Sequence, residues 1–384
     1  MVKKKNLWLI IGVVVICTVV VSVLITNLST KREPDVFKIT AILPLSGNFA
    51  NIGEPKKEAI LLAADDINQR GGINGRKIAI VLEDSKGDPK EGVTILQKNI
   101  DVDRMKIFYV DLTPIALAAV PIVDKSRVIA FVGSAHPTIT DQSKWVFRFF
   151  PSGQQEAEML NDYLVSEGIN RIFILYIGDT YGEELRTILT KKFKEAGREV
   201  IGSESYTISQ KEFRSILAKI KTTNFERIIL IGYGVNFPAI LDQFNELKIP
   251  TNKVIGDIGF IGTPQIAQLS PTLTNNIVFV APSFVHKSTH LDENPTVQKF
   301  VTDYKTKYGK NPNFVAAYAF DAIQVLASAL KQSGSDPDNL RKALLSTKDF
   351  SGVTGKITMR ENGDCATDMM FAKYLDGRII PLQR

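Results

Sequence analysis

The chain has 384 residues, of which 44% are hydrophobic and 23% are charged, and this balance excludes a disordered or fibrous protein. Such a length is enough for two or three domains with sizeable cores. The first 32 residues carry five basic and no acidic side chains, whereas the rest has 42 basic against 41 acidic residues. The net charge of +6 therefore comes mostly from the N-terminus, and the nearly neutral remainder gives no reason to expect a nucleic-acid-binding protein.

The N-terminus combines a basic flank with an apolar segment. Lys3–Lys5 precede Leu7–Ile25, an uncharged run just long enough to cross a membrane as a helix. The run is longer than the apolar region of most cleavable signal peptides, and Thr26–Ser29 is a poor cleavage site. We favour an uncleaved membrane anchor over residues 1–32, linker included, with a cleaved signal as the alternative. Either one places the remainder outside the cytoplasm.

Strand and helix patterns alternate in the first part of the remaining chain. Buried strands are indicated by short apolar runs, and helices by apolar residues spaced three and four apart. Because proline is tolerated in the first turn of a helix, Pro55 and Pro89 are expected to mark two helix starts. Gly71-Gly72 ends the first of these helices. The expected strands are Phe37–Leu43, Lys77–Glu83, Ile107–Val110 and Val128–Val132, with helices at Pro55–Arg70 and from Pro89 onward.

The same alternation restarts after about residue 150. Expected strands are Arg171–Ile177, Glu199–Tyr206, Arg227–Ile231, Lys253–Ile255 and Ile277–Val280. Expected helices are Tyr181–Gly197, Lys211–Lys221, Asn236–Leu247, Pro295–Tyr308, Phe314–Ser333 and Pro337–Ser346, followed by a hairpin of Lys356–Met359 with Met370–Leu375. Two such runs predict two similar α/β lobes with parallel sheets, facing each other across a ligand cleft at the carboxyl ends of the strands.

Motifs for catalysis and for cofactor binding are missing. The sequence has no phosphate-binding loop, no dinucleotide fingerprint and no nucleophile elbow. His286 and His290 have a spacing that binds zinc on a helix, but a polar loop before Asp292 and Glu293 is the favoured interpretation. Cys365 lies in a turn and is not expected to be a nucleophile; with Cys17 in the apolar segment, no disulfide forms within the soluble part. We therefore expect that this protein is not an enzyme and that it binds neither a cofactor nor a metal ion.

One segment resembles a known family. Asp65–Lys77 (D-D-I-N-Q-R-G-G-I-N-G-R-K) follows the pattern D-I-N-x-x-G-G-I-x-G, with Leu43–Gly47 upstream, Glu83–Pro89 downstream and Asp179–Gly182 in the second half. This combination resembles the leucine/isoleucine/valine-binding protein family, the substrate-binding subunits of branched-chain-amino-acid-type ABC importers. The resemblance covers residues 37 to about 380 and implies the type I periplasmic binding protein fold, two Rossmann-like lobes joined by a hinge.

The resemblance also implies three crossings between the lobes. They are expected near Phe149–Pro151, Val280–Ser283 and Phe350–Gly352. The first lobe would then hold residues 37–150 plus 283–350, and the second would hold residues 151–282 plus 351–384.

Ligand contacts follow from the resemblance, residue by residue. In the first lobe, Thr113, Ser134 and His136 are expected to hold the ligand's carboxylate, because free amides and hydroxyls at a helix start suit an anion; Thr113 and Ser134 are otherwise simple helix caps, and His136 an ordinary loop residue. In the second lobe, Tyr181 and Tyr233 are expected to supply aromatic contacts.

At the place expected for the ligand's amino group, the sequence departs from the family pattern. The family's acid for it would fall in Gly256–Gly259, where Asp257 stands one residue before the matching position, Ile258. Asp257 therefore either binds an ammonium group or caps the next segment, and a ligand that is an amino acid, an amide, a small carboxylate or an aromatic acid is admissible.

The resulting hypothesis is an extracytoplasmic solute-binding protein that delivers a small molecule to the permease of an ABC importer. One alternative is a sensor or receptor ectodomain of the same fold that acts with a partner. Another, from a different class, is a nucleotide-dependent α/β enzyme, against which the missing phosphate loops argue.

Overall fold

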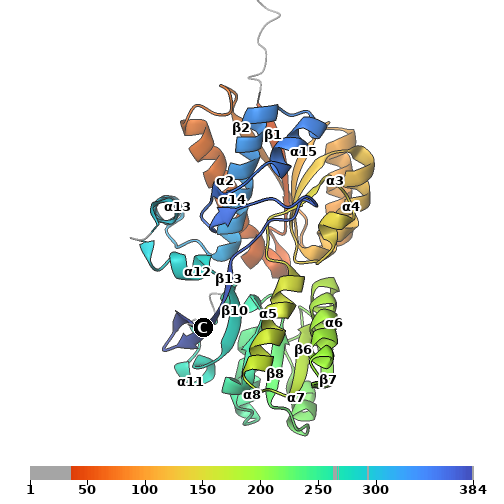
Figure 1. Cartoon of the computed structure of the whole chain (residues 1–384), viewed down its shortest axis with the longest axis vertical. Helices are drawn as coiled ribbons and strands as arrows, with labels where there is room; N and C mark the ends of the chain where they lie inside the picture. The colour runs from red at the N-terminus through yellow and green to blue at the C-terminus, as the bar shows by residue number, and fades with distance from the viewer. Residues whose placement is uncertain (1–35, 263–265, 267, 292–293, 383–384) are drawn as a thin grey trace, which may run out of the picture.

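A computed structural model describes residues 36–262, 266, 268–291 and 294–382, which form two α/β lobes stacked along the long axis (Figure 1). The expected membrane anchor or signal at residues 1–32 lies outside the described residues. Among the described helices, only α14 (Phe314–Ser333) is long and apolar enough to cross a membrane, and 78% of its most apolar stretch is buried inside the protein, as in a core helix.

The first lobe is built on a parallel sheet with the strand order β2-β1-β3-β4-β5. Its apolar strands are buried because helices cover both faces, with α2 packed on α14 and α3 packed on α4. The strands are β1 (Phe37–Leu43), β2 (Ile78–Asp84), β3 (Ile107–Asp111), β4 (Ile129–Gly133) and β5 (Val146–Arg148). The helices are α2 (Ala50–Gln69), α3 (Pro89–Asp101), α4 (Thr113–Ser126), α12 (Phe284–Lys287), α13 (Pro295–Tyr308), α14 and α15 (Pro337–Leu345).

The second lobe has a mixed sheet with the order β14-β13-β10-β9-β8-β6-β7. Five strands are parallel, and β13 and β14 are antiparallel additions at one edge, so the two lobes are less alike than expected. The strands are β6 (Arg171–Ile177), β7 (Glu199–Tyr206), β8 (Arg227–Ile231), β9 (Val254–Gly256), β10 (Val278–Pro282), β13 (Met369–Leu375) and β14 (Arg378–Pro381). The helices are α5 (Gly153–Ser166), α6 (Thr180–Glu195), α7 (Arg214–Lys221), α8 (Phe237–Glu246), α9 (Gly259–Gly262) and α11 (Pro271–Thr274).

Two expectations about local structure were wrong. Helix α2 begins at Ala50 rather than at Pro55, which lies inside it, directly after a short turn at Gly47–Phe49. The expected hairpin does not form, because β12 (Lys356–Ile357) pairs with β11 (Phe350–Ser351), while β13 pairs with β10 and β14.

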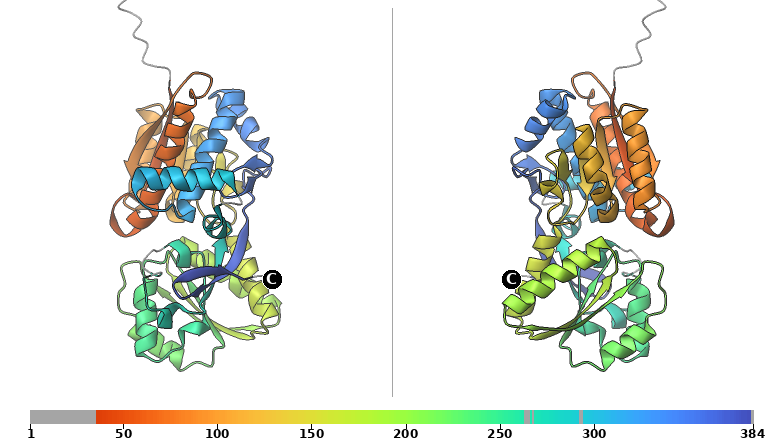
Figure 2. Two further views of the ribbon diagram at one scale, coloured as in Figure 1. Left: turned by 90° about the vertical axis from the view of Figure 1, so that its left-hand side faces the viewer. Right: turned by 90° about the vertical axis from the view of Figure 1, so that its right-hand side faces the viewer.

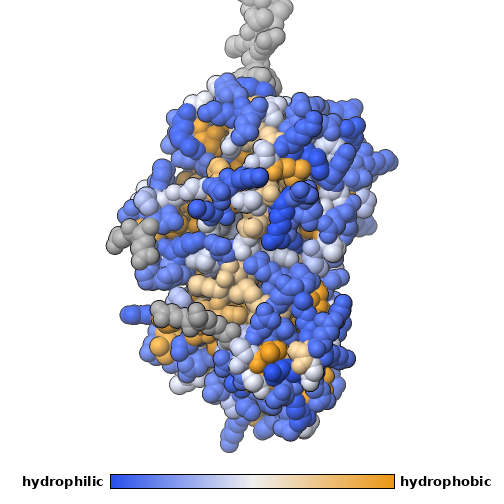
Figure 3. All heavy atoms as spheres, in the orientation of Figure 1, coloured by the Kyte–Doolittle hydropathy of each residue, from blue (hydrophilic) through white to orange (hydrophobic). Residues whose placement is uncertain are grey.

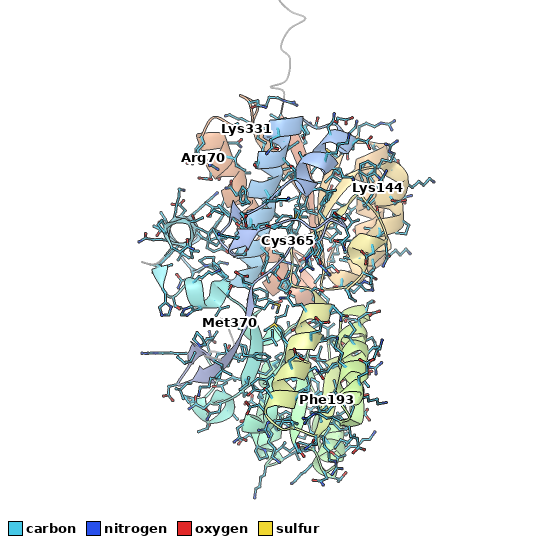
Figure 4. All side chains as sticks on the ribbon, in the orientation of Figure 1. Arg70, Lys144, Phe193, Lys331, Cys365 and Met370 are labelled. Carbon is cyan, nitrogen blue, oxygen red and sulfur yellow. The ribbon has the colours of Figure 1, made fainter. Side chains whose placement is uncertain are left out.

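The chain passes between the lobes three times (Figure 2). The first passage follows β5 and the second follows β10. The third was expected near Phe350–Gly352, but Arg148 and Asp364 form a backbone bridge between β5 and the segment that follows β12. Cys365 accordingly lies within the first lobe and Met370 where the chain enters the second (Figure 4), so residues 351–366 stay with the first lobe and the crossing shifts toward Met369.

Candidate functional site

A cavity lies between the lobes, where strands β3 and β4 of the first lobe end. With its open mouth it encloses about 540 Å³ of empty space. Both lobes present a mainly hydrophilic outer surface, with paler, more apolar area near their junction on the face that Figure 3 shows. The first lobe contributes Ile52, Lys56, Asp111, Leu112, Thr113 and Phe150 to the wall, and the second contributes Tyr181, Tyr233, Ile258 and Gly259.

The first-lobe wall carries a buried ion pair that was not expected. Lys56 of α2 binds Asp111 Oδ1 at the end of β3, and both side chains are almost fully buried. The Lys56 ammonium group also lies 5.0 Å from the ring centroid of Phe150, a favourable cation–π position. Gly133 leaves room for the pair, because a Cβ atom there would lie 2.3 Å from Asp111 Oδ1 and 3.0 Å from Lys56 Nζ.

Thr113 and Ser134 form a small hydroxyl network beside this pair. Thr113 Oγ1 accepts hydrogen bonds from Ser134 Oγ at 3.1 Å and from the Ala135 amide at 3.2 Å. Leu112 has a φ of 67°, which makes the turn from β3 into α4 tight and brings the N-terminus of α4 to the cavity. Thr113 lines the cavity, whereas Ser134 is fully buried behind it and supports Thr113.

His136 lies outside the cavity wall, where the lobes meet. Its Nε2 is 3.6 Å from Oε1 of Glu184 on α6, a helix of the second lobe. Burial lowers the pKa of His136, against the opposing effect of Glu184, and Arg148 lowers it further. The imidazole is therefore mainly neutral at pH 7, and its contact with Glu184 is a weak polar contact between the lobes.

Tyr181 stands between two buried carboxyl groups of the second lobe. Its hydroxyl oxygen is 3.0 Å from Asp257 Oδ2 and 3.3 Å from Glu156 Oε2. One hydroxyl hydrogen serves only one acceptor, so the other carboxyl must carry a proton for both contacts to be hydrogen bonds. Burial raises the pKa of both carboxyl groups, that of Glu156 to about 7, which favours one proton held by this pair of acids.

Asp257 is not open to the cavity. The Gly232 amide donates to its Oδ2 at 2.6 Å, and the Gly259 amide donates to its Oδ1 at 2.8 Å. Burial, followed by the charge of Glu156, raises the pKa of Asp257 despite these hydrogen bonds. Asp257 thus lies behind the Tyr181 ring, held by two backbone amides, and it is not among the residues that line the cavity.

Tyr233 joins the second lobe to the first. Its ring meets the ring of Phe49 edge-on, with 5.2 Å between the centroids, and its hydroxyl donates to Asp179 Oδ2 at 2.7 Å. Asp179 in turn caps α6 by accepting from the Gly182 amide. Tyr181 and Tyr233 lie with ring centroids 5.4 Å apart, so the two predicted aromatic residues do line one wall together.

The remaining candidate residues that the structure describes are His286, His290 and Cys365. The described residues contain no group of three or more His, Cys, Asp or Glu placed to bind a metal ion. The rings of His286 and His290 lie 4.0 Å apart near α12, while Asp292 and Glu293 lie outside the described residues. Burial raises the pKa of Cys365 far above the ordinary thiol range, which disfavours the thiolate needed of a nucleophile.

Comparison with known proteins connects this geometry to binding proteins. Residues 36–378 match the model of a family described as periplasmic binding protein. A "Leu/Ile/Val-binding protein homolog 1" of Brucella suis is 24% identical over 327 residues, covering 84% of this chain and 85% of the relative. A leucine-, isoleucine-, valine-, threonine- and alanine-binding protein of Pseudomonas aeruginosa is 23% identical over 341 residues, covering 88% of this chain and 89% of the relative.

Solved structures show the same fold. A leucine-binding protein from Thermotoga maritima has a TM-score of 0.81 at 22% identity, and the match covers 91% of this chain and 98% of that one. A solute-binding protein of an ABC transporter from R. palustris, solved with benzoate, has a TM-score of 0.79 at 22% identity, with 90% and 95% covered.

Proposed function

The chain belongs to the periplasmic binding protein family, and from this premise we propose that it captures a small solute between its lobes and delivers it to the permease of an ABC importer. The observation that carries the proposal is a cavity whose wall takes charged groups from one lobe and aromatic rings from the other. Relatives are named for binding amino acids, and one similar structure holds benzoate. The solute class is accordingly an amino acid, an amide or a small carboxylate.

Binding proceeds in two steps. The solute first meets the open first lobe, where Lys56, Asp111 and Thr113 offer polar contacts. Closure then brings Tyr181 and Tyr233 over it, and the contact of Tyr233 with Phe49 holds the lobes together. Because the solute gains the second-lobe contacts only in the closed form, it shifts the population toward that form, which the permease recognises.

The chain acts by binding and not by turnover. Among the described residues of the cavity wall, no nucleophile faces a base, since Lys56 and Asp111 neutralise one another and the second-lobe acids lie behind Tyr181. Membership of the family places the lobes outside the cytoplasm. Residues 1–32 would hold them at the outer face of the membrane if the apolar segment is retained.

A thermal-shift screen tests the proposal. The purified protein is unfolded and refolded to release bound solute, then heated with amino acids, amides, short carboxylates and aromatic acids. A solute at about 100 times its Kd stabilises the fold by roughly 2.7 kcal/mol. We expect at least one member of these classes to do so, and a well-folded protein that no small solute stabilises would contradict the proposed function.

A further inference from the structure

One oxygen atom in the cavity wall lacks a partner. Asp111 Oδ1 binds Lys56, but Asp111 Oδ2 is buried and accepts no hydrogen bond from the described residues. A buried carboxylate oxygen without a donor is costly, and such an atom in a native structure indicates that a donor arrives from elsewhere. Since Asp111 lines the cavity, the donor is placed to come from the solute.

The acids of the second lobe do not offer a comparable place. Asp257 accepts backbone hydrogen bonds at both carboxylate oxygens, and Glu156 Oε1 accepts from the Ile258 amide at 2.8 Å. Their remaining interactions go to Tyr181, which separates both acids from the cavity. The first lobe therefore presents the available acceptor.

Charge restricts the solute further. Lys56 and Asp111 already neutralise each other in a wall that is otherwise mostly apolar. An anion would leave one negative charge uncompensated there, close to the second-lobe acids, and a cation would leave a positive charge beside Lys56. A solute without net charge adds no such imbalance, whether it is a zwitterion or an amide.

We propose that the solute is a small molecule without net charge whose N–H donor binds Asp111 Oδ2 in the first lobe. Its acceptor group then lies toward Lys56 and the N-terminus of α4, next to Thr113. Its apolar part lies against Ile52 and Phe150, under the two tyrosine rings. The inference rests on the proposed function and narrows its solute class, because it disfavours aromatic and aliphatic acids that lack an N–H group.

Matched pairs of solutes test the inference on the unmodified protein. Isothermal titration calorimetry compares leucine and isocaproamide with isocaproate, which is leucine without its amino group, and benzamide with benzoate. Within a pair we expect the molecule that carries N–H to bind at least about tenfold more tightly, the usual effect of one hydrogen bond to a charged group. Leucine against isocaproamide then distinguishes a zwitterion from an amide.

Three variants assign the effect to Asp111. Asp111→Asn keeps the shape of the side chain but leaves the positive charge of Lys56 without a counter-charge. The affinity for the N–H-bearing solute should therefore fall at least about tenfold, while the affinity for benzoate or isocaproate should rise. The double variant Lys56→Met/Asp111→Asn removes both charges and so leaves no buried charge without its partner. It should lose the preference for N–H. Asp103→Asn, whose side chain is exposed after α3, is the control and should leave all affinities unchanged.

The outcomes separate the inference from the function on which it rests. Tighter binding of isocaproate or benzoate than of their N–H-bearing partners overturns the inference and leaves solute capture intact. Equal losses in Asp111→Asn and Asp103→Asn also overturn it. A folded protein that no small solute stabilises overturns the proposed function and the inference with it.

Discussion

Arg148 and Asp364 meet in a buried bidentate ion pair, although 216 positions separate them in the chain. Arg148 Nε lies 2.7 Å from Asp364 Oδ1, and Nη2 lies 2.6 Å from Oδ2. The same guanidinium group donates to the His136 carbonyl through Nη1 at 2.6 Å. The pair ties the C-terminal segment to the end of β5, at the point where two of the crossings between the lobes begin.

Breaking this pair should destabilise the protein strongly. Arg148→Met leaves a buried carboxylate without its partner, which costs about 3–5 kcal/mol of unfolding free energy. Denaturant unfolding measures the loss. Arg360→Met is the matched control, because Arg360 contacts the same Asp364 from a largely exposed position at 3.3 Å and should contribute at most about 1 kcal/mol. Equal losses in the two variants would contradict the importance of the buried pair.

Glu156 should make stability depend on pH. Burial raises the pKa of its carboxyl group from 4.5 to about 7, so between these values the folded protein holds a proton that the unfolded chain has released. The free energy of unfolding should therefore fall as the pH rises through this window, by at most about 1.4 kcal/mol per pH unit, and level off above it.

Glu156→Gln tests this dependence, since an amide donates to Tyr181 at every pH. Its unfolding free energy should vary less between pH 5 and 7 than that of the unmodified protein, and the buried Asp257, whose pKa burial also raises, accounts for the variation that remains. Asp162→Asn, at an exposed site on the same helix, should keep the original slope. An unchanged slope in Glu156→Gln would show that Glu156 is ionised in the folded protein.

The two-lobed fold was predictable because its strands are short, continuous apolar runs. β6 and β8 begin and end at the expected residues, since burial on both faces of a parallel sheet leaves a nearly unbroken apolar pattern. The third crossing was not predictable, because it depends on Arg148 and Asp364 coming together. A pair so distant in sequence leaves no periodic signal.

The site was predictable in part. Thr113, Tyr181 and Tyr233 do line the cavity, but their contact with a solute stays a prediction. Lys56 was missed, although it interrupts the apolar face of α2 between Ile52 and Ile60, and a charge at such a position is a usable signal. The sequence contains no such signal for Glu156, because its role arises only where α5 meets the loop that follows β9.

Asp321 holds the turn after β11 and offers a local test of the C-terminal segment. It accepts from the amides of Val353 and Thr354 and, at 2.6 Å, from Thr354 Oγ1. Thr354→Val removes the hydroxyl donor to this buried carboxylate and should cost about 1.5–3 kcal/mol of unfolding free energy. Thr354→Ser keeps the donor and should stay within about 1 kcal/mol of the unmodified protein. Denaturant midpoints that agree between the two variants would rule out the hydroxyl as the cause.

Phe49 should govern how readily the lobes close. Its edge-on contact with Tyr233 joins the lobes beside the cavity, and such aromatic pairs contribute about 0.5–1.5 kcal/mol. Phe49→Ala should therefore weaken solute binding by about two- to tenfold and, without solute, raise the radius of gyration in small-angle X-ray scattering. Val102→Ala, at a 70% exposed site of the first lobe, should change neither quantity. A lower affinity without a change in scattering would mean that Phe49 acts on the solute site and not on the equilibrium between open and closed lobes.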